Sequence, residues 1–219
     1  MQQSHRHFYA ASRRLKLAEV IQRYGLLLIE DDIYSFLAPD DARSFFSLLS
    51  EQTIHICSIS KSLCAGLRVA FLAFPDKYRE RLVSGMPSIN LKTVSLNGEI
   101  IAELIESGKA EKIVTRKKIL ARKRNQVFTS VFPENRPDNV ERFFHWLELP
   151  KHLTSEELEL LALQRGVRLL GSHRFAMRNE KKSSYVRVSV TSPDTEKELK
   201  RGLLILKNIF EEKPRDFFV

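Results

Sequence analysis

The segment SISKSLCAGLR, residues 58–68, contains the residue types that could bind a phosphorylated aldehyde. A lysine held in a partly desolvated pocket loses its proton more readily and can attack a carbonyl carbon to form a Schiff base. Hydroxyl and guanidinium groups can donate hydrogen bonds to a phosphate. The spacing therefore suits Lys61 as the nucleophile and Ser58, Ser60 and Arg68 as phosphate ligands. Taken alone, the pattern also describes a surface lysine that follows a strand.

A second group of reactive side chains lies in EDDIY, residues 30–34. Asp31 and Tyr34 are three residues apart in a predicted strand-to-loop turn, so one edge of a ring could meet both. A carboxylate beside a pyridine nitrogen keeps that nitrogen protonated, and a tyrosine hydroxyl can hydrogen-bond a phenolic oxygen of the same ring. Glu30 and Asp32 are equally compatible with a solvated acidic strand end or a pair of metal ligands.

The elements that must position these residues follow an α/β pattern. Residues 12–24 have apolar side chains near helical spacing, with Ser12 as the N-cap and Gly25 as the stop. The apolar run Leu26–Ile29 predicts a strand buried on both faces of a parallel sheet. Two further strands are predicted at Thr53–Ile59 and Val69–Pro75, with residues 41–50 helical or irregular between the first two strands. The candidate residues then follow strand ends, where α/β proteins bind ligands.

The rest of the chain predicts a helical region and a small α+β unit. Residues 76–132 have helical periodicity, and Ile113, Leu120 and Val127 share one face. A helix is predicted at 154–165 and another from residue 193, and strands are predicted at 142–150, 166–176 and 184–190. We expect three parts: residues 1–85 in a larger α/β domain, 86–130 as long interdomain helices, and 131–219 as the small domain.

At this point the motifs are specific enough to name a resemblance. EDDIY, followed about thirty residues later by SISKSLCAGLRVAFLAFP, resembles the pyridoxal-phosphate (PLP) dependent aminotransferases of fold type I, class I/II. It is similar above all to the aminoadipate/kynurenine aminotransferase-like group and to the aminotransferase-like domains of MocR-type GntR regulators. The resemblance implies a three-layer, mostly parallel large domain and a small α+β domain.

The resemblance also implies roles for individual residues. Lys61 would bond PLP, Asp31 would contact the pyridine nitrogen, Tyr34 would contact the phenolic oxygen, and the phosphate would be bound by Ser58, Ser60 and Arg68. The segment SSYVRVSVTSP is similar to the late family strand whose arginine binds the substrate α-carboxylate, here Arg187. Without that resemblance, an arginine in an alternating strand is a surface or salt-bridge residue. The segment GVRLLGSHRF resembles the family's small-domain strand that ends in a glycine turn and a phenylalanine near the substrate side chain, so Gly171 and Phe175 are secondary candidates.

Two functions follow from the resemblance. The first is amino-group transfer between an amino acid and a 2-oxo acid in a homodimeric PLP enzyme. The second is a PLP-sensing effector domain of a MocR/GntR-type regulator, with DNA bound by a separate winged-helix domain upstream. The resemblance begins in the middle of the family's large domain, and MQQSHRHFYAAS contains no N-P-T-G-like segment. We therefore expect a truncated or split reading frame, or an excised part of a larger protein, that lacks the amino-terminal half of the active site, rather than a self-sufficient enzyme.

Composition narrows the remaining classes. The 219 residues are 43% hydrophobic and carry a formal charge of +9. Much of this charge lies in the segment KIVTRKKILARKRNQ. We interpret its basic residues as the solvated face of an amphipathic helix rather than as a DNA-binding surface. Apolar runs are too short to cross a membrane, and two cysteines without a secretory segment predict a reduced, soluble, cytoplasmic protein. His55, Cys57 and Cys64 supply three possible metal ligands at an unfamiliar spacing, so a packing role is favoured over metal binding.

Overall fold

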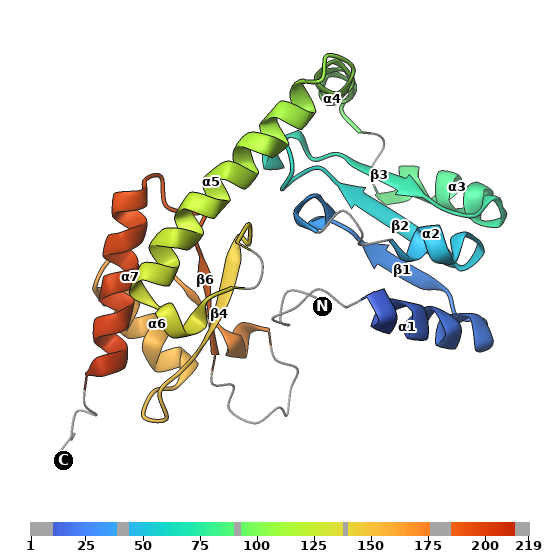
Figure 1. Ribbon diagram of the computed structural model, residues 1–219. Helices are drawn as coiled ribbons and strands as arrows, with labels where there is room; N and C mark the ends of the chain where they lie inside the picture. Colours follow the sequence, from blue (N-terminus) through green and yellow to red (C-terminus); the bar gives the residue numbers. More distant parts are fainter. Residues whose placement is uncertain (1–10, 39–43, 90–92, 138–139, 176–184, 213–219) are drawn as a thin grey trace. The chain divides into compact units, whose positions relative to one another are not determined.

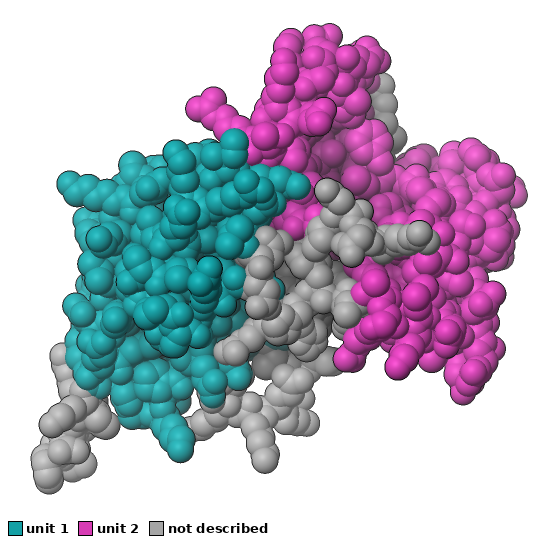
Figure 2. Space-filling model, in the orientation of Figure 1, with its two compact units in different colours: residues 1–7, 118–219 teal, residues 8–117 magenta. Residues whose placement is uncertain are grey.

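The computed structural model describes residues 11–38, 44–89, 93–137, 140–175 and 185–212 (Figure 1). The chain divides into two compact units, coloured separately in Figure 2. We call residues 8–117 the amino-terminal unit, and residues 118–219 together with 1–7 the carboxy-terminal unit. The division is between Lys117 and Lys118, within a single long helix. The three-part division expected from the sequence stays a prediction.

Helix α1 (Ala11–Arg23) ends just before Gly25, the predicted stop, which has a φ of 59°. Glycine has no Cβ, so it adopts this left-handed conformation without steric cost. The Leu26 amide donates to the Ile21 carbonyl at 3.0 Å and the Gly25 amide donates to the Gln22 carbonyl at 3.2 Å. This pair of bonds is a Schellman closure. It takes up Leu26, so the first strand begins two residues later than predicted. Ser12 was wrongly predicted as the N-cap, because it lies inside the helix.

The first sheet has the strand order β1-β2-β3. Strands β1 (Leu28–Asp31) and β2 (Thr53–Ser58) are parallel, whereas β3 (Ala70–Ala73) is antiparallel to β2. The α/β class is therefore as predicted, and the sheet formed by these strands is mixed. Short helices connect the strands: η2 (Ser35–Leu37), α2 (Phe45–Leu48), η3 (Ser50–Gln52) and η4 (Ala65–Leu67).

The two faces of β1 differ in burial. Leu28 packs with Ala18 of α1 and Phe45 of α2. Ile29 points to the opposite face and is 62% exposed, and Leu72 of β3 is also exposed. The expectation that the first strand is buried on both faces was wrong. Its apolar run identifies a strand, but burial depends on a second covering layer that the described residues do not supply at Ile29.

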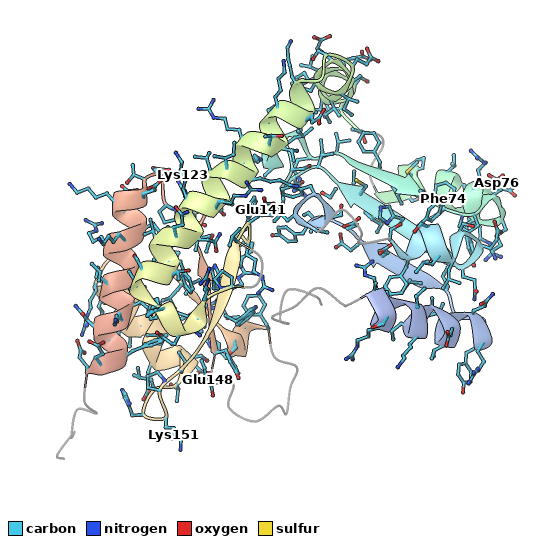
Figure 3. The ribbon with its side chains drawn as sticks, viewed as in Figure 1. Phe74, Asp76, Lys123, Glu141, Glu148 and Lys151 are labelled. Atoms are coloured by element: carbon cyan, nitrogen blue, oxygen red, sulfur yellow. The ribbon has the colours of Figure 1, made fainter. Side chains whose placement is uncertain are left out.

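Helices follow β3, as predicted. They are η5 (Asp76–Tyr78), α3 (Arg79–Ile89), α4 (Ser95–Glu106) and α5 (Lys109–Val131). At the start of this region Asp76 forms an ion pair with Arg79 at 2.8 Å, and Asp76 is labelled in Figure 3. Ile101 of α4 is buried against Ile59, Leu63 and Val69, so α4 packs on the segment between β2 and β3.

The carboxy-terminal unit contains an antiparallel sheet of order β4-β6-β5 with helices packed on it (Figure 1). Its strands are β4 (Phe144–Glu148), β5 (Leu170–Gly171) and β6 (Tyr185–Ser189), and its helical elements are η6 (Pro133–Asn135), α6 (Ser155–Gln164), η7 (Ser172–Arg174) and α7 (Glu196–Glu211). Thr154 and Thr195 form capping boxes that begin α6 and α7. The small α+β unit is as predicted, although the strand expected at 166–176 has only two residues.

Within the ranges that the structure describes, no helix combines the length and apolar character needed to cross a membrane.

Candidate functional site

Strand register brings two of the predicted site residues to one face of the first sheet. Asp31 is paired with Ile56, and parallel neighbours point to the same face, so Asp31, Ile56 and Ser58 share that face. The Asp32 amide continues the ladder by donating to the Ile56 carbonyl at 2.8 Å. Because β1 and β2 are parallel, their carboxyl ends meet at one edge of the sheet, and both predicted motifs begin there.

Lys61 lies in a tight turn directly after β2. The Leu63 amide donates to the Ile59 carbonyl at 2.8 Å, which closes one helical turn around Lys61. The Ser58 hydroxyl is 3.3 Å from the Ser60 hydroxyl and also accepts from the Ser60 amide at 3.4 Å. Lys61 is half-buried, as are both serines. The turn therefore gathers a primary amine and two hydroxyl groups within four consecutive residues.

Arg68 adopts an uncommon backbone conformation at the end of the same segment. Its φ and ψ are 51° and 43°, in the left-handed region, and it is the one non-glycine residue with positive φ among those described. Such a conformation costs roughly 1 kcal/mol for a residue with a Cβ, so the surrounding structure must hold it. The exposed Arg68 side chain thus follows a fixed backbone geometry.

Two residues that sequence reasoning missed contact this segment. The Lys117 ammonium donates to the carbonyls of Lys61 at 3.0 Å and Leu63 at 2.6 Å. The Asn97 side-chain amide donates to the Leu67 carbonyl at 2.9 Å. No local signal could have revealed these contacts, because each one joins residues thirty or more positions apart.

A polar network lies on the opposite face of β1, behind Asp31. Glu30 accepts from the amides of Phe45 at 3.0 Å and Phe46 at 3.2 Å, and its carboxylate lies 3.0 Å from His55 Nδ1. His55 Nε2 lies 3.5 Å from the Asp32 carboxylate. The two acids that flank Asp31 are therefore structural, and they leave Asp31 itself on the exposed face.

His55 and the two cysteines of this region have different surroundings. Among the described residues, no group of three or more His, Cys, Asp or Glu side chains is arranged to hold a metal ion. Cys57 is partly buried, and burial, followed by the nearby Asp32 carboxylate, raises the pKa of its thiol. Cys64 is exposed on the turn that follows Lys61. The two thiols thus differ in surroundings, and His55 interacts with carboxylates.

Tyr34 begins the short helix η2 at the end of the EDDIY motif. Its carbonyl accepts from the Leu37 amide at 3.0 Å, and the Asp32 carboxylate accepts from the Ser35 amide at 3.0 Å. These bonds form a compact turn after β1, as the motif predicted. They fix the backbone from Asp31 to Tyr34 at the edge of the sheet where β1 and β2 end. The turn that contains Lys61 begins at the same edge.

Arg187 belongs to the other unit, where it lies on the central strand β6. Its guanidinium carbon is 4.7 Å from the centre of the Phe144 ring and 4.8 Å from that of Phe175. Phe175 in turn meets Trp146 edge-on, with ring centres 5.3 Å apart. Planar guanidinium groups interact favourably with aromatic faces. The secondary candidate Phe175 is thus a direct neighbour of Arg187.

Gly171 is required for close packing. A Cβ at this position would lie 2.7 Å from His173 Nδ1 and 2.8 Å from the Ser155 Cβ. The Ser155 hydroxyl and His173 Nδ1 are 2.8 Å apart, but Ser155 is buried, so this pair packs the start of α6 rather than presenting a nucleophile. The turn predicted at Gly171 is present, and its role within this unit is steric.

The basic residues of α5 are mostly engaged by the chain itself. Arg122 and Lys118 both pair with Glu141, at 2.6 and 3.8 Å. Glu141 is labelled in Figure 3. Arg124 donates to the carbonyls of Val190, Pro193 and Asp194. The prediction of a solvated basic face therefore holds for only some of these residues, because Lys117, Arg122 and Arg124 bond to neighbouring segments of the chain.

Comparison with known proteins gives a consistent family. The sequence model of the family described as "Aminotransferase class I and II" matches residues 11–203. An uncharacterised HTH-type transcriptional regulator of Bacillus subtilis, YdeF, is 32% identical over 94% of this chain and 45% of its own length. The 2-aminoadipate transaminase of Thermus thermophilus is 31% identical over 70% of this chain and 42% of its own length.

Solved structures agree with the family match. Alpha-aminoadipate aminotransferase of Thermus thermophilus, crystallised with N-(5'-phosphopyridoxyl)-L-leucine, superposes with a TM-score of 0.80 at 25% identity, over 92% of this chain and 54% of the other. An aromatic aminotransferase of Pyrococcus horikoshii has a TM-score of 0.81 at 21% identity, over 92% of this chain and 56% of the other. The chain thus spans about half the length of the relatives that it matches.

Proposed function

This chain belongs to the aminotransferase class I and II family, and from that membership we propose that it binds PLP at the carboxyl ends of β1 and β2, with Lys61 as the covalent attachment point. The observation that carries the proposal is the register of these strands. It sets Asp31 and Ser58 on one face, and the Lys61 turn follows directly. This register supports the proposal, because the Asp31 carboxylate, the Ser58 and Ser60 hydroxyls and Lys61 all lie at or directly after the neighbouring carboxyl ends of two parallel strands.

The donor set fits PLP in chemical type. The hydroxyls of Ser58 and Ser60 lie together at 3.3 Å and, with Arg68, offer donors to a phosphate. Asp31 is exposed on the open face of the sheet and can hold a proton on a pyridine nitrogen. When bound, PLP supplies an aromatic ring that accepts the electrons left on a substrate carbon. Lys61 can then carry a proton to and from that carbon.

For the complete protein we propose amino-group transfer between an amino acid and a 2-oxo acid in a homodimer. Arg187 would bind the substrate α-carboxylate, because a guanidinium offers two parallel donors to a carboxylate. Its two aromatic neighbours, Phe144 and Phe175, restrict the positions that its side chain can adopt. The relatives named for aminoadipate transfer give the substrate class its first candidates.

A second candidate function is a PLP-sensing module of a transcriptional regulator. It is favoured by one observation: the similarity to the HTH-type regulator YdeF extends over 94% of this chain. In that case DNA contacts would come from a separate domain. The engagement of Lys117, Arg122 and Arg124 with this chain's own groups agrees with such a division, because these cations are already bound.

The first test is covalent capture of the cofactor. The purified chain is titrated with PLP, reduced with borohydride and digested, and the modified lysine is located by mass spectrometry. We expect the pyridoxyl group on Lys61, its loss in Lys61→Ala, and its retention in Lys77→Ala, which removes an exposed lysine of η5. Selective labelling of a different lysine, or of none in a folded chain, would contradict the assignment.

Enzyme and sensor are separated by the fate of the cofactor. An amino acid is added to the complete, PLP-loaded protein. The cofactor is then released by denaturation and its chemical form is identified by mass spectrometry. Transfer converts the cofactor to its aminated form in an amount equal to the protein. A sensor changes the visible absorbance on adding the amino acid but returns the cofactor unchanged.

A further inference from the structure

The Lys61 turn has carbonyl groups that a longer helix would have satisfied. The Leu63 amide closes one helical turn onto Ile59, but Cys64 is extended, with φ −149° and ψ 127°, so the helix does not continue. In a continuing helix each carbonyl accepts from the amide four residues later. The carbonyls of Lys61 and Leu63 therefore need other donors, and half-buried backbone oxygens are costly to leave without them.

Helix α5 supplies those donors through one side chain. The Lys117 ammonium lies 3.0 Å from the Lys61 carbonyl oxygen and 2.6 Å from that of Leu63. An ammonium has three donors and no acceptor, and its hydrogen bonds to carbonyls are charge-assisted. Apolar contacts support the same arrangement, because Ile113 of α5 packs against the cluster that contains Ile59 and Leu63.

Helix α4 holds the other end of the segment. The Asn97 side-chain amide donates to the Leu67 carbonyl at 2.9 Å, immediately before Arg68 with its left-handed backbone. Ile101, one turn along α4, is buried against Val69 on the far side of Arg68. The two helices thus fix the backbone at both ends of residues 61–68.

The position of Lys117 is not that of an ordinary surface lysine on an amphipathic helix. Lys117 is half-buried, and burial lowers the pKa of its ammonium, Cys64 raises it in part, and the positive charge of Lys61 lowers it further. A cation that is partly desolvated beside another cation is destabilised unless its hydrogen bonds compensate. The two carbonyls offset part of that cost.

We propose that Lys117 and Asn97 are positioning residues of the cofactor site. They hold the segment from Lys61 to Arg68 in its binding conformation before the cofactor arrives, so that binding does not have to order it. This inference rests on the proposed function of Lys61. Neither side chain needs to touch the cofactor. Lys117 acts through the backbone carbonyl of Lys61, and Asn97 acts through that of Leu67, the residue before Arg68.

The test measures backbone order and cofactor capture in the same variants of the full chain. Lys117→Met removes the hydrogen-bond donors and keeps a side chain of similar length, whereas Lys117→Arg keeps both donors and charge. Asn97→Ser shortens the side chain that donates to the Leu67 carbonyl. Lys112→Met is the matched control, an exposed lysine of the same helix. Hydrogen exchange of the Leu63 and Leu67 amides reports the two ends of the segment without any cofactor, and borohydride capture of PLP reports Lys61.

We expect Lys117→Met to speed exchange at Leu63 and to weaken PLP capture at Lys61, each by about tenfold, as loss of a charge-assisted bond predicts. Asn97→Ser should act at Leu67, Lys117→Arg should restore capture, and Lys112→Met should match the wild type. Unchanged capture in Lys117→Met and Asn97→Ser, with the wild type labelled at Lys61, would overturn the inference and leave the proposed function standing. A wild type without label on Lys61 would overturn the proposed function and this role with it.

Discussion

Among the described residues, the carboxy-terminal unit buries fourteen apolar side chains in one continuous cluster, whereas the two main clusters of the amino-terminal unit hold four and three. Burial of apolar surface is the main favourable contribution to folding, at roughly 25 cal/mol per Å². The carboxy-terminal unit therefore has the stronger basis for independent stability. The amino-terminal unit depends more on polar contacts, such as those of Glu30 and Lys117.

The candidate cofactor residues all lie in the less well-packed unit. Asp31 shares its sheet face with the exposed side chains of Ile29 and Leu72. A face of this kind favours contact with a further apolar surface. The proposed cofactor residues therefore lie outside the larger apolar cluster, whereas Arg187, the proposed carboxylate ligand, belongs to the unit that contains it. Four predictions test this contrast in packing between the two units.

The largest effect is expected from removing a core ring. Phe128 of α5 is fully buried, stacked on His145 and packed near Phe132, so Phe128→Ala should destabilise the carboxy-terminal unit by about 3–5 kcal/mol. The matched change Ile29→Ala, on the exposed sheet face, should alter stability by less than about 0.5 kcal/mol. The stability of Phe128→Ala is measured by urea unfolding, followed by the fluorescence of Trp146, the sole tryptophan. That of Ile29→Ala is measured by amide exchange in β2. Equal losses at both sites would remove the contrast between the units.

Acidification should destabilise the carboxy-terminal unit through His145. Burial, and next the positive charge of Arg142, lower the pKa of His145 from 6.5 to about 3, and its Nε2 lies 2.6 Å from the Asn125 side-chain oxygen. Between those values the unfolded chain binds a proton that the folded chain does not, so stability is retained above about pH 6.5 and falls as pH falls. The expected loss between pH 6 and pH 4 is about 2.5 kcal/mol.

The control for this prediction is His145→Gln, which keeps a side chain able to hydrogen-bond Asn125 and cannot titrate. Urea unfolding of both proteins across pH 4–7, again followed by Trp146 fluorescence, gives the two slopes. The variant is less stable at neutral pH because stacking on Phe128 is lost, but its pH dependence in this window should be flatter. Parallel slopes would show that His145 is not the group responsible.

Local sequence signals predicted the elements of the fold well. Gly25 ends α1 as expected because its positive φ is a local property of a glycine after a helical pattern. The motifs EDDIY and SISKSLCAGLR were placed correctly at the carboxyl ends of β1 and β2, because apolar runs followed by polar residues identify strand ends. The roles assigned to Asp31, Tyr34, Lys61, Ser58, Ser60, Arg68 and Arg187 stay predictions.

Properties that depend on tertiary contacts were not predictable. Leu120 was expected on the apolar face of α5 but is exposed, while Ala121, Asn125 and Phe128 are buried, because the sheet of the carboxy-terminal unit selects which face it covers. The strand expected at 166–176 is short because residues 172–174 form a 3-10 turn. The contacts of Lys117 join distant segments, so its appearance in a basic run suggested a solvated side chain instead.

A glycine pair tests how fully each unit is packed. The added methyl of Gly171→Ala would meet His173 and Ser155 at 2.7 and 2.8 Å, so this variant should lose about 2 kcal/mol. Gly85 lies inside α3 with no atom within 4 Å of an added Cβ, so Gly85→Ala should stabilise its helix by up to about 1 kcal/mol. Trp146 fluorescence in urea and amide exchange of α3 measure the two changes. A stabilising Gly171→Ala would show that the carboxy-terminal unit is less tightly packed than its core indicates.

The smallest effect is expected at Glu30, which tests whether polar contacts hold the amino-terminal unit together. Glu30→Gln keeps the shape of the side chain but weakens its bonds to the Phe45 and Phe46 amides and to His55, for an expected loss of about 1 kcal/mol. Glu19→Gln, on α1, is the control for a change of one charge. Faster amide exchange in β2 of Glu30→Gln alone would support the polar network. If exchange is unchanged, the small apolar clusters are sufficient to hold β1 and β2, and the two units differ less in kind than their cores suggest.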